Sequence, residues 1–111
     1  MNQNVIHLSA DTEKPLFLWF EPWADGVAFP AGSEIEIRAE SELPGQLELE
    51  ADSERTVVYG WGGATLDVLV NGNMVKSYDT PAPDFMNSNW VKMIFGPPPT
   101  PSDEDKAKLT K

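Results

Sequence analysis

The chain contains the segment Leu16-Phe17-Leu18-Trp19-Phe20-Glu21-Pro22-Trp23, whose first five residues are all apolar. An apolar run without alternation is typical of a strand that is covered on both faces. Pro22 has no N–H to donate and biases the residue before it toward an extended conformation, so the strand ends there. We therefore expect a central strand over residues 16–20 and a turn that carries Trp23.

Two other segments, 33–40 and 46–52, alternate apolar and polar residues with the period of a strand that has one buried face. The residues expected to be buried are Ile35, Ile37, Ala39, Leu47, Leu49 and Ala51. Both solvent faces carry glutamates, and direct pairing would place like charges opposite each other. We expect register, Arg38 or placement in different sheets to separate the two strands. We also expect the strands that begin at Ser33 and Ala64 to cover the two faces of the central strand.

Shorter extended segments complete the predicted fold, at 5–8, 27–29, 56–59, 66–70, 74–78 and 90–95. Asn71-Gly72 joins two of them, and an Asn-Gly pair between extended segments favours a tight hairpin. Ten prolines and eight glycines supply frequent turns, and no long amphipathic helix separates the strands. The sequence predicts an all-β fold with about eight short, mostly antiparallel strands, in a β-sandwich, a jelly roll or a small barrel.

The length of 111 residues suits a single domain with one core. We expect that domain over residues 1–96. Residues 97–111 begin with a proline-rich run and continue with charged residues, so we expect a flexible tail there.

The net charge of −10 narrows the range of partners. Nucleic-acid binding depends on cations that neutralise phosphates, so no nucleic-acid partner is expected, and an anionic membrane surface would repel the chain. No apolar run approaches the roughly 20 residues of a membrane span, and the first residues lack a signal-peptide pattern. We expect a cytoplasmic protein without a membrane partner, which associates with itself or binds a protein partner or an unknown small molecule.

The sequence contains no recognisable catalytic or metal-binding pattern. There is no cysteine, His7 is the only histidine, and G-x-S-x-G and calcium-loop motifs are absent. Gly60-Trp61-Gly62-Gly63 lacks the lysine and the helix of a phosphate-binding loop. The acids of segments 33–40 and 46–52 fit a solvent-facing sheet surface. We therefore predict no catalytic residues, no metal site and no cofactor, and a structural or surface role for His7.

The segment Phe29-Pro30-Ala31-Gly32-Ser33-Glu34-Ile35 resembles the Pro-x-Gly turn through which many small cupin-like barrels enter a strand. The resemblance covers this short segment alone and implies a small barrel. Cupin enzymes hold a metal with two histidines one residue apart, a glutamate and a later third histidine. This chain has a single histidine, so the resemblance implies no metal chemistry and no site residues here.

The aromatic residues provide the only candidate for a binding site. Trp23 and Trp61 both lie in turns beside proline or glycine, where recognition residues are common, and exposed rings beside carboxylates bind sugars, cations or apolar side chains. The alternative for any tryptophan is core packing. The predicted ligand-binding residues are Glu21, Trp23, Asp25, Tyr59 and Trp61.

These observations favour a small, acidic, non-enzymatic binding or interaction module that engages a protein or a small polar ligand through loop aromatics. The alternative is a small ligand-binding or enzymatic cupin-like barrel that uses carboxylates and aromatics without a histidine metal site. A third hypothesis is an accessory subunit of a larger assembly, for which the tail would act as a tether.

Overall fold

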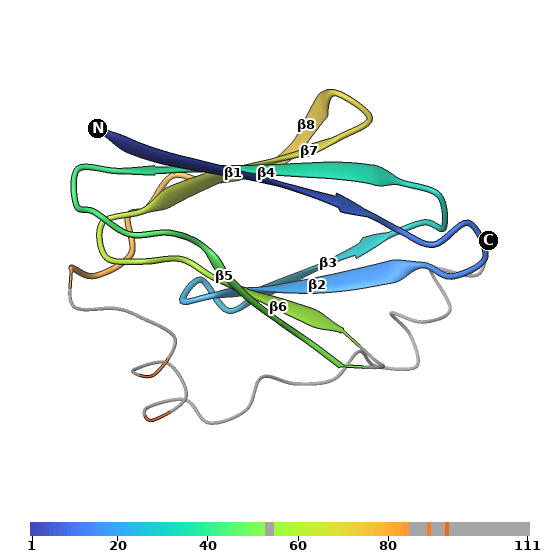
Figure 1. Cartoon of the computed structure of the whole chain (residues 1–111), viewed down its shortest axis with the longest axis horizontal. Helices are drawn as coiled ribbons and strands as arrows, with labels where there is room; N and C mark the ends of the chain where they lie inside the picture. Colours follow the sequence, from blue (N-terminus) through green and yellow to red (C-terminus); the bar gives the residue numbers. More distant parts are fainter. Residues whose placement is uncertain (53–54, 85–88, 90–92, 94–111) are drawn as a thin grey trace.

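A computed structural model of the chain describes residues 1–52, 55–84, 89 and 93, and this part contains eight strands in two four-stranded sheets (Figure 1). The all-β class predicted from the sequence is confirmed. The strand expected over 90–95 lies outside the described residues except for Met93, and so does the tail, 97–111. The strands are β1 (Asn2–Ser9), β2 (Leu16–Glu21), β3 (Asp25–Phe29), β4 (Glu34–Ser41), β5 (Glu48–Ala51), β6 (Thr56–Tyr59), β7 (Thr65–Val70) and β8 (Asn73–Tyr78).

The two sheets lie face to face as separate layers (Figure 1). The first sheet has the order β1-β4-β7-β8 and is antiparallel throughout. The second has the order β3-β2-β6-β5, and its central pair, β2 and β6, is parallel. The two glutamate-rich strands, β4 and β5, belong to different sheets, which is one of the three ways of separating their charges that the sequence allowed. Within the first sheet, Arg38 of β4 lies opposite Asp67 of β7.

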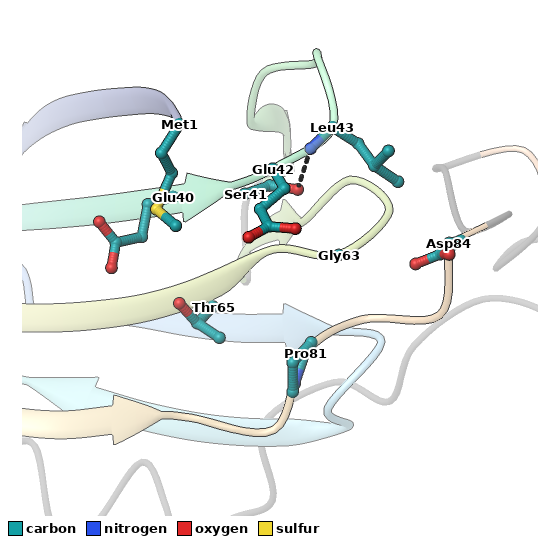
Figure 2. A pocket seen from close by; sticks show the side chains of 9 residues that line it. All are labelled: Met1, Glu40, Ser41, Glu42, Leu43, Gly63, Thr65, Pro81 and Asp84. Atoms are coloured by element: carbon teal, nitrogen blue, oxygen red, sulfur yellow. Dashed lines mark hydrogen bonds between the residues drawn. The ribbon is translucent and has the colours of Figure 1, made fainter.

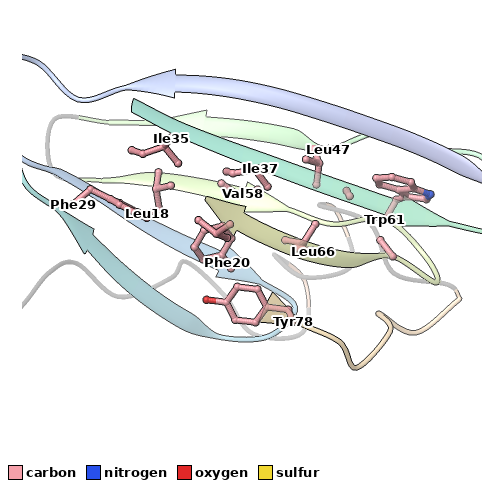
Figure 3. Close-up of a cluster of buried hydrophobic side chains, with 13 residues drawn as sticks. Leu18, Phe20, Phe29, Ile35, Ile37, Leu47, Val58, Trp61, Leu66 and Tyr78 are labelled. Atoms are coloured by element: carbon pink, nitrogen blue, oxygen red, sulfur yellow. The ribbon is translucent and has the colours of Figure 1, made fainter. Parts of the chain in front are cut away.

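Strand β2 is central in its sheet and is buried on both faces, as predicted. Leu18 and Phe20 point between the sheets into the main core (Figure 3), and neither is exposed. The prediction that the strands from Ser33 and Ala64 cover opposite faces is wrong, because β4 and β7 are neighbours in the first sheet and both lie on the same side of β2. The other side, the outer face of the second sheet, has its own apolar cluster of Val57, Tyr59 and Ala82, with Trp19 and Trp23 packed against it.

The β7–β8 hairpin is confirmed. Asn71 and Gly72 both have positive φ, 50° and 86°, as the type I′ turn requires. A register shift between Val68 and Leu69 interrupts the ladder between the two strands.

The alternation over 46–52 predicts that Leu47, Leu49 and Ala51 are buried, and this prediction is only partly right. Leu47 is buried in the main core, but Leu49 is 44% exposed and Ala51 is exposed as well. Within the described part of the chain, strand β5 pairs with β6 alone and forms the edge of its sheet. An apolar residue at a sheet edge has neighbours on one side only, so its period-two pattern does not ensure burial.

Because Leu47 is buried and Leu49 is exposed, the same substitution at the two residues tests the fold. We expect Leu47→Ala to lower the free energy of unfolding by about 2–3 kcal/mol, within the range for buried leucines. Leu49→Ala, the same substitution at the exposed edge, should change it by less than about 0.5 kcal/mol. Urea denaturation followed by circular dichroism measures both. Equal losses for the two variants would contradict the edge position of β5.

Candidate functional site

The five residues predicted to bind a ligand lie in three different places. Trp61 belongs to the main core, Glu21 and Tyr59 are buried on the outer face of the second sheet, and Trp23 and Asp25 line an open depression. The structure therefore brings only two of the five together at a surface where a ligand can reach them.

Trp61 is a structural residue although it lies in a glycine-rich turn. Its side chain is only 6% exposed, and its indole N–H donates to the carbonyl oxygen of Leu43 at 2.8 Å. The ring lies directly on Gly45, where an added Cβ would overlap with Cδ1 of Trp61. The indole thus ties the turn after β6 to the segment between β4 and β5, and it presents little surface to a ligand.

Glu21 is a buried carboxylate at the end of β2. It lies opposite Tyr59 in the parallel pair with β6, and its Oε1 accepts a hydrogen bond from the indole N–H of Trp19. Burial raises the pKa of Glu21 above its ordinary value, and the hydrogen bond from Trp19 opposes part of that shift. Both Glu21 and Tyr59 are too enclosed for direct contact with a ligand.

The raised pKa of Glu21 predicts a pH-dependent effect of Glu21→Gln on stability. The folded protein takes up a proton on Glu21 at higher pH than the unfolded chain, so the stability this proton provides is complete below the unfolded pKa and is lost as the pH rises through the folded pKa. Glutamine keeps an oxygen that accepts from Trp19 and has no charge to bury.

We therefore expect Glu21→Gln to raise the unfolding free energy at pH 7, and this gain should shrink as the pH falls toward 4. Urea denaturation of both proteins at several pH values gives the difference between their unfolding free energies. The effects of the other carboxylates are common to both proteins and cancel in this difference. Glu48→Gln, a change at an exposed residue of β5, is the control. A gain in unfolding free energy that does not depend on pH would contradict the raised pKa of Glu21.

The open depression lies where the end of β8, in the first sheet, meets the turn between β2 and β3, in the second. We call it the aromatic depression; its volume is about 390 Å³. The residues that line it are Trp23, Ala24, Asp25, Lys76, Ser77, Tyr78, Asp79 and Thr80.

Trp23 is held in a fixed position beside the aromatic depression. Its indole N–H donates to the carbonyl oxygen of Thr80 at 2.8 Å, and its ring packs on Tyr78 with the centroids 5.4 Å apart. The far edge of the ring lies against Gly60, where an added Cβ would be 2.6 Å from Cη2 of Trp23. Ala24, the next residue, has a φ of 54°, a conformation that costs a non-glycine residue free energy and is found at functional sites.

Asp25 is the centre of a polar network that links the two sheets. Its Oδ2 accepts a hydrogen bond from the hydroxyl of Tyr78 at 2.7 Å and lies 3.3 Å from the ammonium nitrogen of Lys76. Burial, the hydrogen bond to Asp25 and the charge of Asp25 all raise the pKa of Tyr78, so its hydroxyl stays protonated as a donor. The side chains of Asp25 and Lys76 remain partly exposed.

The sequence did not point to Lys76 and Tyr78 as members of this site. Both lie in an ordinary strand after the Asn-Gly turn, and Tyr78 is 53 positions from the aspartate it binds. The local signals at Trp23 and Asp25, a proline and a turn, have no counterpart in β8.

A second depression, of about 490 Å³, lies near the end of β4 (Figure 2). We call it the acidic depression, because Glu40, Glu42 and Asp84 contribute carboxylates to its lining. Among the residues that the structure describes, no aromatic side chain lines it, and Ser41 is buried with its hydroxyl already bonded to the carbonyl oxygen of Gly62 and the amide of Leu43. Across the described ranges, no group of three or more His, Cys, Asp or Glu side chains is arranged to hold a metal ion.

His7 lies on the polar outer face of the first sheet. Its side chain is largely exposed, and Nδ1 is 3.7 Å from a carboxylate oxygen of Glu36 on the neighbouring strand. This position agrees with the surface role predicted from the sequence.

No helix in the part of the chain that the structure describes is long and apolar enough to cross a membrane. Comparison of the chain with protein-family models, with curated proteins and with solved structures finds no match. The case for a function therefore depends on the geometry of this molecule.

Proposed function

We propose that the protein is a non-enzymatic binding module that engages a small polar ligand or a segment of a protein partner through the aromatic depression. The observation that carries the proposal is the convergence of Trp23 with the Asp25, Lys76 and Tyr78 network on one exposed surface. An aromatic ring beside charged hydrogen-bonding groups is the usual composition of a recognition site.

The fixed position of Trp23 supports a binding role. Its N–H is bonded to Thr80, its ring is packed on Tyr78, and the preceding strand is part of the core. A ring that is already ordered before binding loses little conformational entropy when a ligand contacts it.

The alternative, a ligand-binding or enzymatic barrel, is supported by one observation, the burial-raised pKa of Glu21. Glu21 lines neither the aromatic nor the acidic depression, so that carboxyl has no adjoining space for a substrate in either. This is why we favour the binding module.

Chemical-shift mapping on the ¹⁵N-labelled full chain tests the proposal. We would titrate it with three sets of probes: neutral hexasaccharides, charged small molecules such as spermine and hexagalacturonate, and short peptides rich in lysine and arginine. We expect at least one set to shift the indole N–H of Trp23 and the amides of residues 76–80, and Trp23→Ala to abolish those shifts. Shifts confined to other surfaces, or no shifts from any set, would contradict the proposal.

A cytoplasmic location and self-association, both predicted from the sequence, remain part of this proposal. Strand β8 supports self-association, because it is an edge strand among the described residues, with Met74 and Val75 each more than half exposed. We expect light scattering after size exclusion to show a dimer or larger species at about 100 μM, above the μM affinity of a modest interface. Val75→Lys should reduce that species. A monomer of the unaltered protein at this concentration would remove self-association from the proposal.

A further inference from the structure

Resting on the proposed function, we infer that the ligand of the aromatic depression is a neutral saccharide. Three features of the depression carry this inference: its paired charges, the way the indole of Trp23 is held, and its open shape.

The charged groups of the depression favour a ligand without net charge. Asp25 and Lys76 lie within 3.3 Å of each other, so each already neutralises the other. An anion would bind Lys76 only in competition with Asp25, and against the repulsion of a protein with a net charge of −10. A cation would have to displace Lys76 from Asp25 or pair with Asp79 alone, and an ion pair at an exposed carboxylate contributes little free energy. A hydroxyl group both donates and accepts hydrogen bonds, so neighbouring hydroxyls can bond to the carboxylate and the ammonium without separating them.

The indole of Trp23 offers an apolar surface rather than a hydrogen bond. Its N–H is used by the carbonyl oxygen of Thr80, and one side of its ring is packed on Tyr78. The ring also packs against the cluster of Val57, Tyr59 and Ala82, yet Trp23 is only half-buried and lines the depression. The part of the side chain that reaches the depression can therefore offer aromatic carbon to a ligand. The C–H groups on one face of a sugar ring match such a surface, while the hydroxyls at the ring edge reach Asp25 and Lys76.

The open shape of the depression favours one unit of a longer saccharide over a free small molecule. Small-molecule sites usually enclose most of their ligand. The aromatic depression is open to solvent, so it would contact a ligand from one side. A chain of sugar units can place one ring on Trp23 and extend past both ends of the site.

Isothermal titration and chemical-shift mapping with cellohexaose, maltohexaose, xylohexaose and mannohexaose test this inference on the full chain. We expect at least one of them to bind and to shift the Trp23 indole N–H. Trp23→Ala should weaken that binding by at least about tenfold, which corresponds to about 1.4 kcal/mol. Lys76→Met removes the ammonium donor and Asp25→Asn removes the charge of the acceptor, so each should weaken the binding about fivefold, because hydrogen bonds to charged groups are the stronger ones.

Gly60→Ala provides a further check that does not alter any group in the depression. The added Cβ would lie 2.6 Å from the far edge of the Trp23 ring, so the ring must shift. We expect a weakened affinity, with chemical-shift changes in the free protein confined to Trp23 and the residues that it contacts. Leu49→Ala, a change at an exposed residue of β5 outside the depression, is the control and should leave the affinity unchanged.

The outcomes separate this inference from the proposed function. If hexagalacturonate, spermine or the basic peptides shift the residues of the aromatic depression and no neutral hexasaccharide does, the saccharide inference is wrong and the binding module stands. If a hexasaccharide binds only at the acidic depression, or if no probe binds at all, both are wrong.

Discussion

We expect Phe20→Ala to lower the free energy of unfolding by about 3–5 kcal/mol, the range for a buried phenylalanine. The side chain of Phe20 is completely buried between the two sheets, and its ring centroid lies 5.1 Å from that of Tyr78. The alanine would leave a cavity that residues from both sheets border. A loss of this size is a large part of the 5–15 kcal/mol that stabilises a typical domain.

Urea denaturation monitored by circular dichroism measures this loss. Phe20→Leu, which keeps most of the apolar volume, should lose clearly less. Val75→Ala, at an exposed position, should stay within about 0.5 kcal/mol of the unaltered protein. A loss below about 1 kcal/mol for Phe20→Ala would mean that the site can collapse, and the packing of the two sheets would have to be revised.

The substitution also connects the core to the aromatic depression. Phe20 packs on Tyr78, and Tyr78 in turn supports the ring of Trp23 and donates to Asp25. A substitution at Phe20 is therefore expected to disturb the candidate site through the side chain of Tyr78. Affinity for a ligand of the depression should fall in Phe20→Leu even under conditions where that variant is fully folded.

The central strand and the hairpin were predictable because their signals are local. The apolar run of β2 requires cover on both faces wherever the strand lies, and Asn71-Gly72 supplies the two positive φ values of its turn without help from distant residues. Burial at Ile35 and Ile37 follows for the same reason, since alternation on a strand inside a sheet fixes which side chains face the core.

Properties that depend on which strands are neighbours were not predictable. Leu49 and Ile37 each lie in a segment where apolar and polar residues alternate. In the described part of the chain, however, β5 is an edge strand and β4 is not. The contact between Asp25 and Tyr78 joins two different sheets, and its two residues are far apart in the sequence. Strand order and sheet packing are decided by the whole chain, so the site could be located only in part.

Trp23 and Trp61 show this limit most directly, and they give the second large prediction. Both lie in turns beside proline or glycine, so the sequence assigned them the same role. The structure buries Trp61 on Gly45 and leaves Trp23 half-buried at the surface. We expect Trp61→Ala to lower the unfolding free energy by about 3–5 kcal/mol, because it opens a cavity and leaves the carbonyl of Leu43 without its donor.

Two comparisons make this prediction specific. Trp61→Phe removes the N–H but keeps most of the ring, so its loss should be smaller, roughly 1–2 kcal/mol, and should reflect mainly the hydrogen bond to Leu43. Trp23→Ala should also cost less than Trp61→Ala, since part of its ring is already in contact with water, while its effect on ligand affinity should be larger. Urea denaturation of the three variants ranks the losses. If Trp23→Ala destabilised the protein as much as Trp61→Ala, the ring of Trp23 would be a structural element of the fold, and the aromatic depression would lose the exposed indole on which its proposed function depends.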